Sequence, residues 1–273
     1  MDEYLEHKGM IVHYRVLGSG ARGWLCFHGF GRKAEDFEVF RPLLSEDDRL
    51  VCINLFGHGQ SAFPPERIDW RPLQPEEWCE VVELLLESQG FGRFNLLGYS
   101  MGGRIAMMTY LGFADRVDRM LLLAPDGLKK NKLYQFASGT FLGRAIYRSV
   151  IPDPWILFTL SKLLNRLGLL SDKLHRFVHV HLDTREKREL VYSVWLIYRR
   201  LFPDCAVLAQ KLNTSGTQCN MIFGTYDSII PVRLANRLVK RLRQPDIIHK
   251  VAVGHRLMER TTLDYIRERG LWK

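Results

Sequence analysis

The fold of this chain is decided by the stretch Gly98-Tyr99-Ser100-Met101-Gly102, a G-x-S-x-G motif. The motif lies directly after a short apolar run, 94–97, and directly before a stretch with helical spacing, 101–111. In this context a serine occupies a sharp, strained turn between a strand and a helix, called a nucleophile elbow. The glycines on either side leave room for such a turn. The motif therefore predicts a Ser100 hydroxyl that stands clear of a sheet at a helix N-terminus, where negative charge is favoured.

Further apolar runs alternate with helical stretches along the chain. Runs that are apolar without a break are expected for parallel strands buried on both faces. The alternation of strand and helix predicts the α/β class, with a doubly wound parallel sheet. The predicted strands are Tyr4–Lys8, Met10–Val16, Trp24–Phe27, Leu50–Ile53, Phe94–Leu97, Met120–Leu123, Cys219–Phe223 and Ile247–Val251, and the predicted helices of the core are 74–89, 101–111, 231–243 and 257–269.

The middle of the chain has a different character. It is rich in Leu, Phe and basic residues at helical spacing, and no strand-like run interrupts it. We therefore expect an all-helical cap inserted at 129–213 into a core domain made of 1–128 and 214–273. From Lys129 to Lys211 there are 15 Lys and Arg residues against 6 Asp and Glu, so this segment carries the whole net charge of +9. The asymmetry indicates either an anionic partner or a solvated helical surface.

Bulk properties exclude several classes of protein. The 273 residues are 47% hydrophobic and 25% charged, as in ordinary globular proteins. No signal peptide is expected, because the acidic N-terminus is followed by no apolar segment. No apolar stretch approaches the roughly 18 residues of a membrane-spanning helix. The five cysteines are scattered and odd in number, which favours a reduced, cytoplasmic protein over a disulfide or metal framework.

A serine hydroxyl needs a base to become a good nucleophile, and in this arrangement the acid and the histidine follow it in the chain. Asp227 follows the predicted strand 219–223, and His255 comes just after the last predicted strand. Both belong at the carboxyl edge of the sheet, where sites of open α/β folds gather. Asp246 is the alternative acid, but it precedes its strand. We predict a catalytic triad in which His255 takes the proton of Ser100 and Asp227 orients the imidazole.

An oxyanion formed at the serine needs two backbone donors. We expect one from the N–H of Met101, the residue after the nucleophile. The turn 28–31, which follows an apolar run, is expected to supply the other, and we assign it to the N–H of Phe30. His28 is predicted to brace this turn. His58, in a glycine-rich turn after another strand, is predicted to brace that turn rather than to act in catalysis.

These landmarks together carry a resemblance to a known family. In chain order they resemble the α/β-hydrolase fold-1 family, and the resemblance covers the chain except the insertion. It implies an eight-stranded, mostly parallel sheet with a helical cap inserted after the sixth strand. Serine as the nucleophile argues against the dehalogenase and epoxide-hydrolase branches, which carry aspartate there. The landmarks are His28-Gly29-Phe30-Gly31, Phe56-Gly57-His58-Gly59-Gln60-Ser61, Gly98-Tyr99-Ser100-Met101-Gly102-Gly103, Gly224-Thr225-Tyr226-Asp227 and Gly254-His255.

The expected activity is hydrolysis of a carboxylic ester, or a related acyl bond, of a small or lipid-like substrate through an acyl-enzyme. This chemistry needs no metal and no organic cofactor. A second interpretation is a carbon–carbon bond hydrolase or lyase that uses the same triad. The run 98–106 resembles the elbow of a menaquinone-pathway lyase, and carbon–carbon bond hydrolases share the triad. A third, from another class, is a catalytically silent binding protein with a hydrolase fold.

Three residues are candidate substrate contacts: Tyr99 and Arg104 at the elbow, and Trp155 in the insertion. Arg104 is suited to bind a substrate carboxylate, and a structural role is the alternative. Some apolar side chains of the insertion are expected to line a pocket over Ser100. A cap that is both basic and apolar favours an acidic acyl substrate or peripheral contact with an anionic membrane.

The remaining clusters are expected to be structural. The basic run 240–243 closes a helix, where cations suit the helix dipole, so no nucleic-acid binding is expected. His175, His179 and His181 lack the carboxylates or cysteines that would complete a zinc site, so we expect them to pack within the cap or to lie on its surface. The oligomeric state is open between a monomer and a homodimer.

Overall fold

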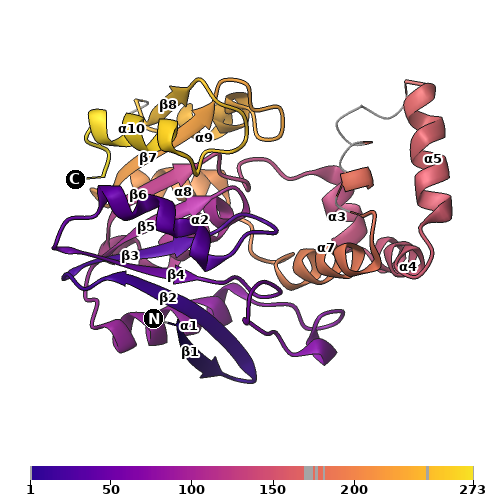
Figure 1. The fold of residues 1–273 in the computed structure, drawn as a ribbon, viewed down its shortest axis with the longest axis horizontal. Helices are drawn as coiled ribbons and strands as arrows, with labels where there is room; N and C mark the ends of the chain where they lie inside the picture. Colours follow the sequence, from indigo (N-terminus) through magenta and orange to yellow (C-terminus); the bar gives the residue numbers. More distant parts are fainter. Residues whose placement is uncertain (1, 169–174, 176–177, 181, 244–245, 273) are drawn as a thin grey trace. The chain divides into compact units, whose positions relative to one another are not determined.

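The computed structural model describes residues 2–168, 175, 178–180, 182–243 and 246–272. It contains an eight-stranded sheet in the order β1-β2-β4-β3-β5-β6-β7-β8 (Figure 1). β2 is antiparallel to β1 and β4, and the pairs from β4 onward are parallel, which confirms the expected α/β fold. The strands are β1 (Asp2–His7), β2 (Met10–Gly18), β3 (Arg22–Phe27), β4 (Asp48–Ile53), β5 (Phe94–Tyr99), β6 (Val117–Leu123), β7 (Gln218–Gly224) and β8 (Ile248–Val251).

Most helices of the core form where the sequence pattern indicates. α1 (Pro75–Gln89) starts with a proline and two acidic residues and ends at Gly90, whose φ of +69° closes the helix. α2 (Met101–Phe113) begins directly after Ser100, and most of its residues are buried, as a helix pressed onto a sheet requires. The core also contains α8 (Cys205–Leu212), α9 (Asn236–Val239) and α10 (Arg260–Glu268).

Two segments of the core differ from the sequence prediction. The helix expected at 231–243 is shorter, because it consists of a 3-10 turn, Val232–Ala235, followed by α9. The connection from β3 to β4 contains a 3-10 helix, Ala34–Leu43, that was not predicted. Its larger buried side chains recur every third residue, which matches three residues per turn rather than the α-helical period. They are Phe37, Phe40 and Leu43.

A buried carboxylate anchors the start of β4. Asp48 is fully buried and accepts hydrogen bonds from Arg22 at 2.7 Å and from the backbone N–H of Ser45 at 2.8 Å. The indole N–H groups of Trp24 and Trp272 also donate to it, at 3.3 and 3.2 Å. Burial opposes ionisation, but the hydrogen bonds outweigh it and lower the pKa of Asp48. Trp272 also stacks on Trp24, with centroids 4.2 Å apart, and this ties the C-terminal segment to β3.

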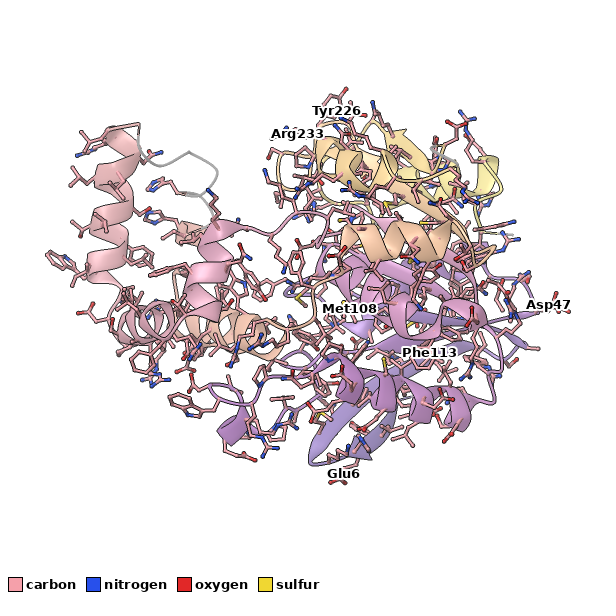
Figure 2. The ribbon with its side chains drawn as sticks, turned by 180° about the vertical axis from the view of Figure 1, so that it is seen from behind. Glu6, Asp47, Met108, Phe113, Tyr226 and Arg233 are labelled. Atoms are coloured by element: carbon pink, nitrogen blue, oxygen red, sulfur yellow. The ribbon has the colours of Figure 1, made fainter. Side chains whose placement is uncertain are left out.

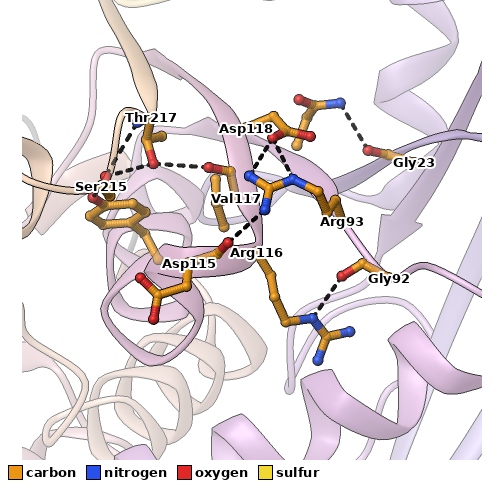
Figure 3. A network of polar contacts seen from close by, with 11 residues as sticks. Gly23, Gly92, Arg93, Asp115, Arg116, Val117, Asp118, Ser215 and Thr217 are labelled. Carbon is orange, nitrogen blue, oxygen red and sulfur yellow. Dashed lines mark hydrogen bonds and ion pairs between the residues drawn. The ribbon is translucent and has the colours of Figure 1, made fainter.

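The amino and carboxyl ends of the parallel strands lie at opposite edges of the sheet. In Figure 2, Asp47 marks the amino edge, just before β4, and Tyr226 marks the carboxyl edge, just after β7. At the amino edge, polar contacts join the strand starts (Figure 3). Arg93 pairs with Asp118 at 2.6 Å, and the Thr217 hydroxyl donates to the carbonyl of Val117 at 2.8 Å. These contacts fix β5, β6 and β7 against one another at the edge away from the predicted site.

The chain divides into two compact units. The first contains the sheet and consists of Met1–Pro64, Leu73–Lys129 and Leu201–Lys273, and the second is helical and consists of Pro65–Pro72 and Lys130–Arg200. The second unit is therefore shorter than the insertion predicted at 129–213. α8 belongs to the first unit because it contacts α2 and α9. The second unit contains α3 (Lys132–Gly139), α4 (Phe141–Val150), α5 (Trp155–Arg166) and α7 (Arg185–Ile197).

Polar contacts attach Pro65–Pro72 to the helices of the second unit. The Arg199 guanidinium donates to two backbone carbonyls of this segment, at 2.8 and 2.7 Å. Arg148 pairs with the Asp69 carboxylate at 2.7 Å, and the Tyr192 hydroxyl donates to the same carboxylate. The partners are far apart in the sequence, so no local pattern reveals that this segment belongs to the second unit.

The helix lengths and the state of the cysteines can be read directly from the structure. Among the described residues, no helix combines the length and the hydropathy needed to cross a bilayer. All five cysteines are free thiols, and Cys26, Cys52 and Cys219 are buried.

We expect replacement of Trp272 by alanine to lower the free energy of unfolding by about 3–5 kcal/mol, because the change removes a buried ring and one hydrogen bond to Asp48. Trp155→Ala is the matched control, because 68% of the Trp155 side chain is already exposed. Urea unfolding followed by circular dichroism measures both. Equal losses in the two variants would contradict the role given to Trp272.

Candidate active site

Ser100 occupies a strained turn between β5 and α2. Its φ of +53° and ψ of −116° lie outside the regions that non-glycine residues normally adopt. Close packing imposes this geometry, because a Cβ on Gly102 would lie 1.9 Å from the carbonyl oxygen of Phe27. A Cβ on Gly103 would lie 2.6 Å from Pro125. The first turn of α2 is thus pressed against the end of β3, and only glycine fits there.

Backbone hydrogen bonds hold the elbow to the end of β6. The N–H of Ser100 donates to the carbonyl of Leu123 at 2.9 Å. The carbonyl of Ser100 accepts from Asp126 and from Gly103, both at 2.9 Å. The strained residue is therefore bonded on both sides, and its side chain is held in one position at the carboxyl edge of the sheet.

The structure brings the three residues of the predicted triad together. The Nε2 atom of His255 lies 3.1 Å from the Oγ atom of Ser100, and its Nδ1 atom lies 2.7 Å from a carboxylate oxygen of Asp227. The ionised carboxylate can only accept, so the partners assign the ring proton to Nδ1 and leave Nε2 to accept from the serine hydroxyl. Asp227 follows β7 and His255 follows β8, which is why residues so distant in the sequence meet.

Asp227 is held as an anion. Only 5% of the residue is exposed. Burial alone would raise its pKa, but the hydrogen bond from His255 and the electrostatic attraction of that imidazole oppose the burial. The backbone N–H groups of Ile230 and Ile229 add to this effect, at 2.9 and 2.7 Å. The net result is a pKa for Asp227 below its usual value, so a negative charge faces the imidazole at neutral pH.

Tyr99 is buried and contacts the histidine from the other side. Its hydroxyl donates to the backbone carbonyl of His255 at 2.9 Å, and the two ring centroids are 5.5 Å apart. The loops after β7 and β8 also approach closely, because a Cβ on Gly224 would lie 2.2 Å from the carbonyl oxygen of Gly254. Tyr99 was predicted as a substrate contact, and the structure places its hydroxyl on the segment that carries the imidazole.

The turn assigned to the oxyanion lies directly against the elbow. A Cβ on Gly29 would lie 3.0 Å from the Tyr99 ring and 3.3 Å from the Cβ of Ser100. Gly31 has a φ of +69°, and its N–H donates to the Nε2 atom of His58 at 2.9 Å. The position of the turn is therefore set by Tyr99 on one side and by the His58 imidazole on the other.

Two buried histidines act as neutral braces beside this turn. The Nε2 atom of His28 accepts from the N–H of Leu55 at 3.0 Å. Burial and the neighbouring His58 lower the pKa of His28 to about 3, and burial lowers the pKa of His58 to about 4. Both rings are therefore neutral at physiological pH, and each uses a ring nitrogen to accept a backbone N–H. These contacts match the bracing roles predicted for them.

Arg104 is a buried cation on the first turns of α2. One of its guanidinium nitrogens lies 3.6 Å from the Asp126 carboxylate, and the group stands 5.5 Å from the Phe202 ring centroid. The side-chain stem packs on Gly127, where a Cβ would lie 2.9 Å from it. The side chain thus contacts the loop that follows β6.

The other predicted positions lie in the second compact unit. Trp155 begins α5 and remains a prediction as a substrate contact. His175 shares a hydrogen bond of 2.8 Å with Ser161, and His179 stacks on Phe158 with centroids 5.0 Å apart. His181 lies outside the described residues. No group of three or more potential metal ligands occurs within the part of the chain that the structure describes.

Part of the chain, including the elbow, matches a known protein family. The family described as the alpha/beta hydrolase fold matches residues 25–189, which is more than half of the chain. The chain belongs to the α/β-hydrolase fold family. The matched range contains three of the five motifs on which the resemblance rested, at 28–31, 56–61 and 98–103.

Relatives of this α/β hydrolase are distant. The dihydrolipoyllysine-residue acetyltransferase component of the acetoin cleaving system of Pseudomonas putida is 27% identical over 84% of this chain, which spans 58% of that relative. The 2-hydroxy-6-oxononadienedioate/2-hydroxy-6-oxononatrienedioate hydrolase of Burkholderia vietnamiensis is 24% identical over 89% of this chain and 84% of its own length. A thermophilic esterase from Thermogutta terrifontis matches the whole of both chains with a TM-score of 0.66 at 18% identity, which shows the shared fold.

Sequence reasoning missed one further brace of the hydrolase site. Asn54 directly follows β4. Its side-chain oxygen accepts from the N–H of Ala34 at 2.8 Å, and its side-chain nitrogen lies 2.6 Å from the Nδ1 atom of His13. A Cβ on Gly59 would lie 2.6 Å from this side chain. The available signal was a buried polar residue at the end of an apolar strand, because such a residue must be hydrogen-bonded.

We expect Gly102→Ala to destabilise the hydrolase by roughly 3 kcal/mol and to displace Ser100, because the added methyl group would overlap the carbonyl of Phe27. Gly92→Ala is the matched control, since a Cβ there meets nothing within 4 Å. Thermal unfolding compares the two variants. A Gly102→Ala protein as stable as the control would refute the packing constraint.

Removal of the His58 imidazole should make the free energy of unfolding less dependent on pH under acidic conditions. A histidine with a pKa near 6.5 when unfolded and about 4 when folded binds its proton only in the unfolded chain as the pH falls between these values. Folded stability is therefore complete above pH ~6.5 and is lost toward pH ~4, by about 3 kcal/mol. His58→Gln keeps an acceptor for Gly31, so this variant should lose about 3 kcal/mol less than the wild type between those pH values. Guanidinium unfolding at a series of pH values tests this, and parallel curves would contradict it.

Proposed function

We propose that this α/β hydrolase is a serine esterase that cleaves a carboxylic ester through an acyl-enzyme on Ser100. The observation that carries the proposal is the continuous hydrogen-bonded path from the Ser100 hydroxyl through the His255 imidazole to the buried Asp227 carboxylate, at 3.1 and 2.7 Å. A hydroxyl with a base in reach, and a base oriented by a carboxylate, is the arrangement that activates serine as a nucleophile.

The proposed reaction follows from these contacts. Nε2 of His255 takes the hydroxyl proton as Oγ of Ser100 attacks the ester carbonyl. The N–H groups of Met101 and Phe30 hold the oxyanion, and the imidazolium then gives its proton to the departing alcohol. Water attacks the acyl-enzyme by the same route and releases the acid. Met101 suits its role because it is the first residue of α2, where a backbone N–H has no carbonyl one turn earlier to bond with.

Charges near the site favour an acyl substrate that carries an acidic group. Arg32 follows the oxyanion turn and is half-buried, and Arg256 follows His255 and is exposed. Burial raises the pKa of Tyr99; the charges of Arg32 and Arg256 lower it, and those of Asp227 and Asp36 raise it. Arg32 pairs with Asp36 at 3.6 Å, so an acidic substrate would meet Arg256 and a partly neutralised Arg32.

A second candidate function is hydrolysis of a carbon–carbon bond. It is favoured by the Burkholderia vietnamiensis relative, whose name describes a hydrolase of dienedioates and whose match covers 89% of this chain. Such substrates carry two carboxylates, so the same cations would suit them. The proposed triad serves either bond, and the two functions therefore differ in substrate rather than in the residues that act.

We expect a fluorophosphonate probe to label the protein at Ser100, because the probe reacts with activated serine hydroxyls. Ser100→Ala should abolish labelling and lower ester hydrolysis about ten-thousandfold or more. Ser149→Ala is the control, since this exposed serine of α4 should leave both unchanged. Labelling is measured by mass spectrometry and turnover with p-nitrophenyl esters.

The same assay separates the candidates. Labelling with rapid ester turnover supports the esterase. Labelling without measurable ester turnover, together with turnover of a 2-hydroxy-6-oxo-dienoate, would contradict the esterase. That result would support the carbon–carbon hydrolase instead. Absence of labelling in folded protein refutes both and leaves a binding protein.

A further inference from the structure

The helical unit presents an apolar face to solvent. Ten of the seventeen large apolar side chains that are exposed in the described chain lie between Leu133 and Leu167, on α3, α4, α5 and the residue after α5. On α5 they form a stripe with the spacing i, i+4, i+7 and i+11, which places them on one side of the helix. The stripe consists of Ile156, Leu160, Leu163 and Leu167, whose exposures range from 48% to 67%.

α5 carries apolar side chains on two sides: Leu157, Phe158 and Leu164 are half-buried around Ser161, whereas the stripe is exposed. A helix of a soluble protein normally turns its apolar stripe to the core and its polar side to water. Ser161 is the one buried residue of α5, and it bonds to His175. The apolar stripe therefore does not serve the core of this unit, and in Figure 2 side chains project from α5 away from the neighbouring helices.

α4, which contacts α5, also exposes apolar side chains. Phe141, Leu142 and Ile146 are 49–70% exposed. Exposed apolar side chains that occur singly need no explanation, but a contiguous group on adjacent helices marks an interaction surface. We call this set, the α5 stripe together with these three residues, the apolar face.

Cations border the apolar face. Lys162 and Arg166 directly precede Leu163 and Leu167, so they lie about 100° around α5 from the stripe. From Lys129 to Arg166 the chain has seven Lys and Arg residues and one carboxylate, Asp153. Among the described residues, no carboxylate lies within ion-pair distance of Lys162 or Arg166. Long basic side chains beside an apolar stripe can bury their stems and keep their charges in a polar layer.

We propose that the apolar face docks on an anionic lipid bilayer, with α5 lying in the interface plane and Lys162 and Arg166 at the headgroups. The helix is about 18 Å long, too short to cross a bilayer but suited to lie in it. Apolar side chains enter the acyl boundary, and the cations meet lipid phosphates. A second copy of this chain fits less well, because a twofold contact through the same face would bring like charges together. The inference goes beyond the proposed function, because binding needs no turnover.

Vesicle binding of the full chain tests this proposal. We expect the protein to sediment with phosphatidylcholine vesicles that contain phosphatidylglycerol, and to bind pure phosphatidylcholine at least tenfold more weakly. Ile156→Asn with Leu163→Asn should weaken binding to the anionic vesicles by a factor of ten or more, because two apolar side chains no longer enter the bilayer. Lys162→Gln with Arg166→Gln should weaken it roughly 30-fold, at about fivefold for each charge.

The matched control is Arg237→Gln with Lys240→Gln, which removes the same charge from exposed positions of the core unit. It should change binding less than twofold. If this control variant loses as much binding as the Lys162 and Arg166 variant, the protein is attracted by its net charge alone. That result would overturn the proposal.

Two other results also overturn the proposal. One is failure of the folded wild type to bind anionic vesicles. The other is a dimer in sedimentation equilibrium that the Ile156 and Leu163 variant dissociates, since that would assign the apolar face to a second copy. Fluorophosphonate labelling of Ser100 in the same samples reports separately on the proposed catalytic function, so failure of one proposal is distinguished from failure of the other.

Discussion

The close approach of α2 to β3 is the constraint on which the site depends. The first turn of the helix lies so near the strand that the position of Gly102 has no room for a side chain beside the carbonyl of Phe27. This contact forces Ser100 to a positive φ and directs its hydroxyl away from the sheet. The strain is balanced by backbone hydrogen bonds on both sides of the residue, to Leu123 at the end of β6 and to Asp126 in the loop after it. Ser100 is thus positioned by backbone packing rather than by contacts of its side chain.

Around the fixed serine, burial gives different imidazoles different tasks. His28 and His58 are buried, which opposes a positive charge on either ring, and the neighbouring His58 adds to this effect at His28. They therefore act as neutral acceptors for backbone N–H groups of the turns. His255 instead faces the Asp227 carboxylate, which would stabilise a proton that arrives from serine. Asp227 remains ionised despite burial because its oxygens accept from the imidazole and from two backbone N–H groups. Charge can therefore develop at one histidine without disturbing the turn beside it.

Local patterns in the sequence predicted the strands, the elbow and the order of the proposed triad, because buried parallel strands and glycine-rich turns impose their own residue types. The features that were missed depend on contacts between distant residues. The hydroxyl of Tyr99 reaches the carbonyl of His255, and Asp69 is held by Arg148 of a helix far along the chain. Neither pairing leaves a periodic signal. The 3-10 helix Ala34–Leu43 was missed for another reason, because its apolar residues repeat every third position and match neither an α-helix nor a strand.

The two compact units use their apolar residues in opposite ways. In the core, the side chains of the central strands and of α2 are buried, and their burial stabilises the fold. In α5, Leu157, Phe158 and Leu164 are half-buried, but Ile156, Leu160 and Leu163 are exposed, so folding of this unit in water gains little from that stripe. The same residues become favourable once a non-aqueous phase covers them, and the neighbouring Lys162 and Arg166 favour a phase with an anionic boundary. The proposed docking on an anionic bilayer would therefore account for both the exposed apolar stripe of α5 and the two cations beside it.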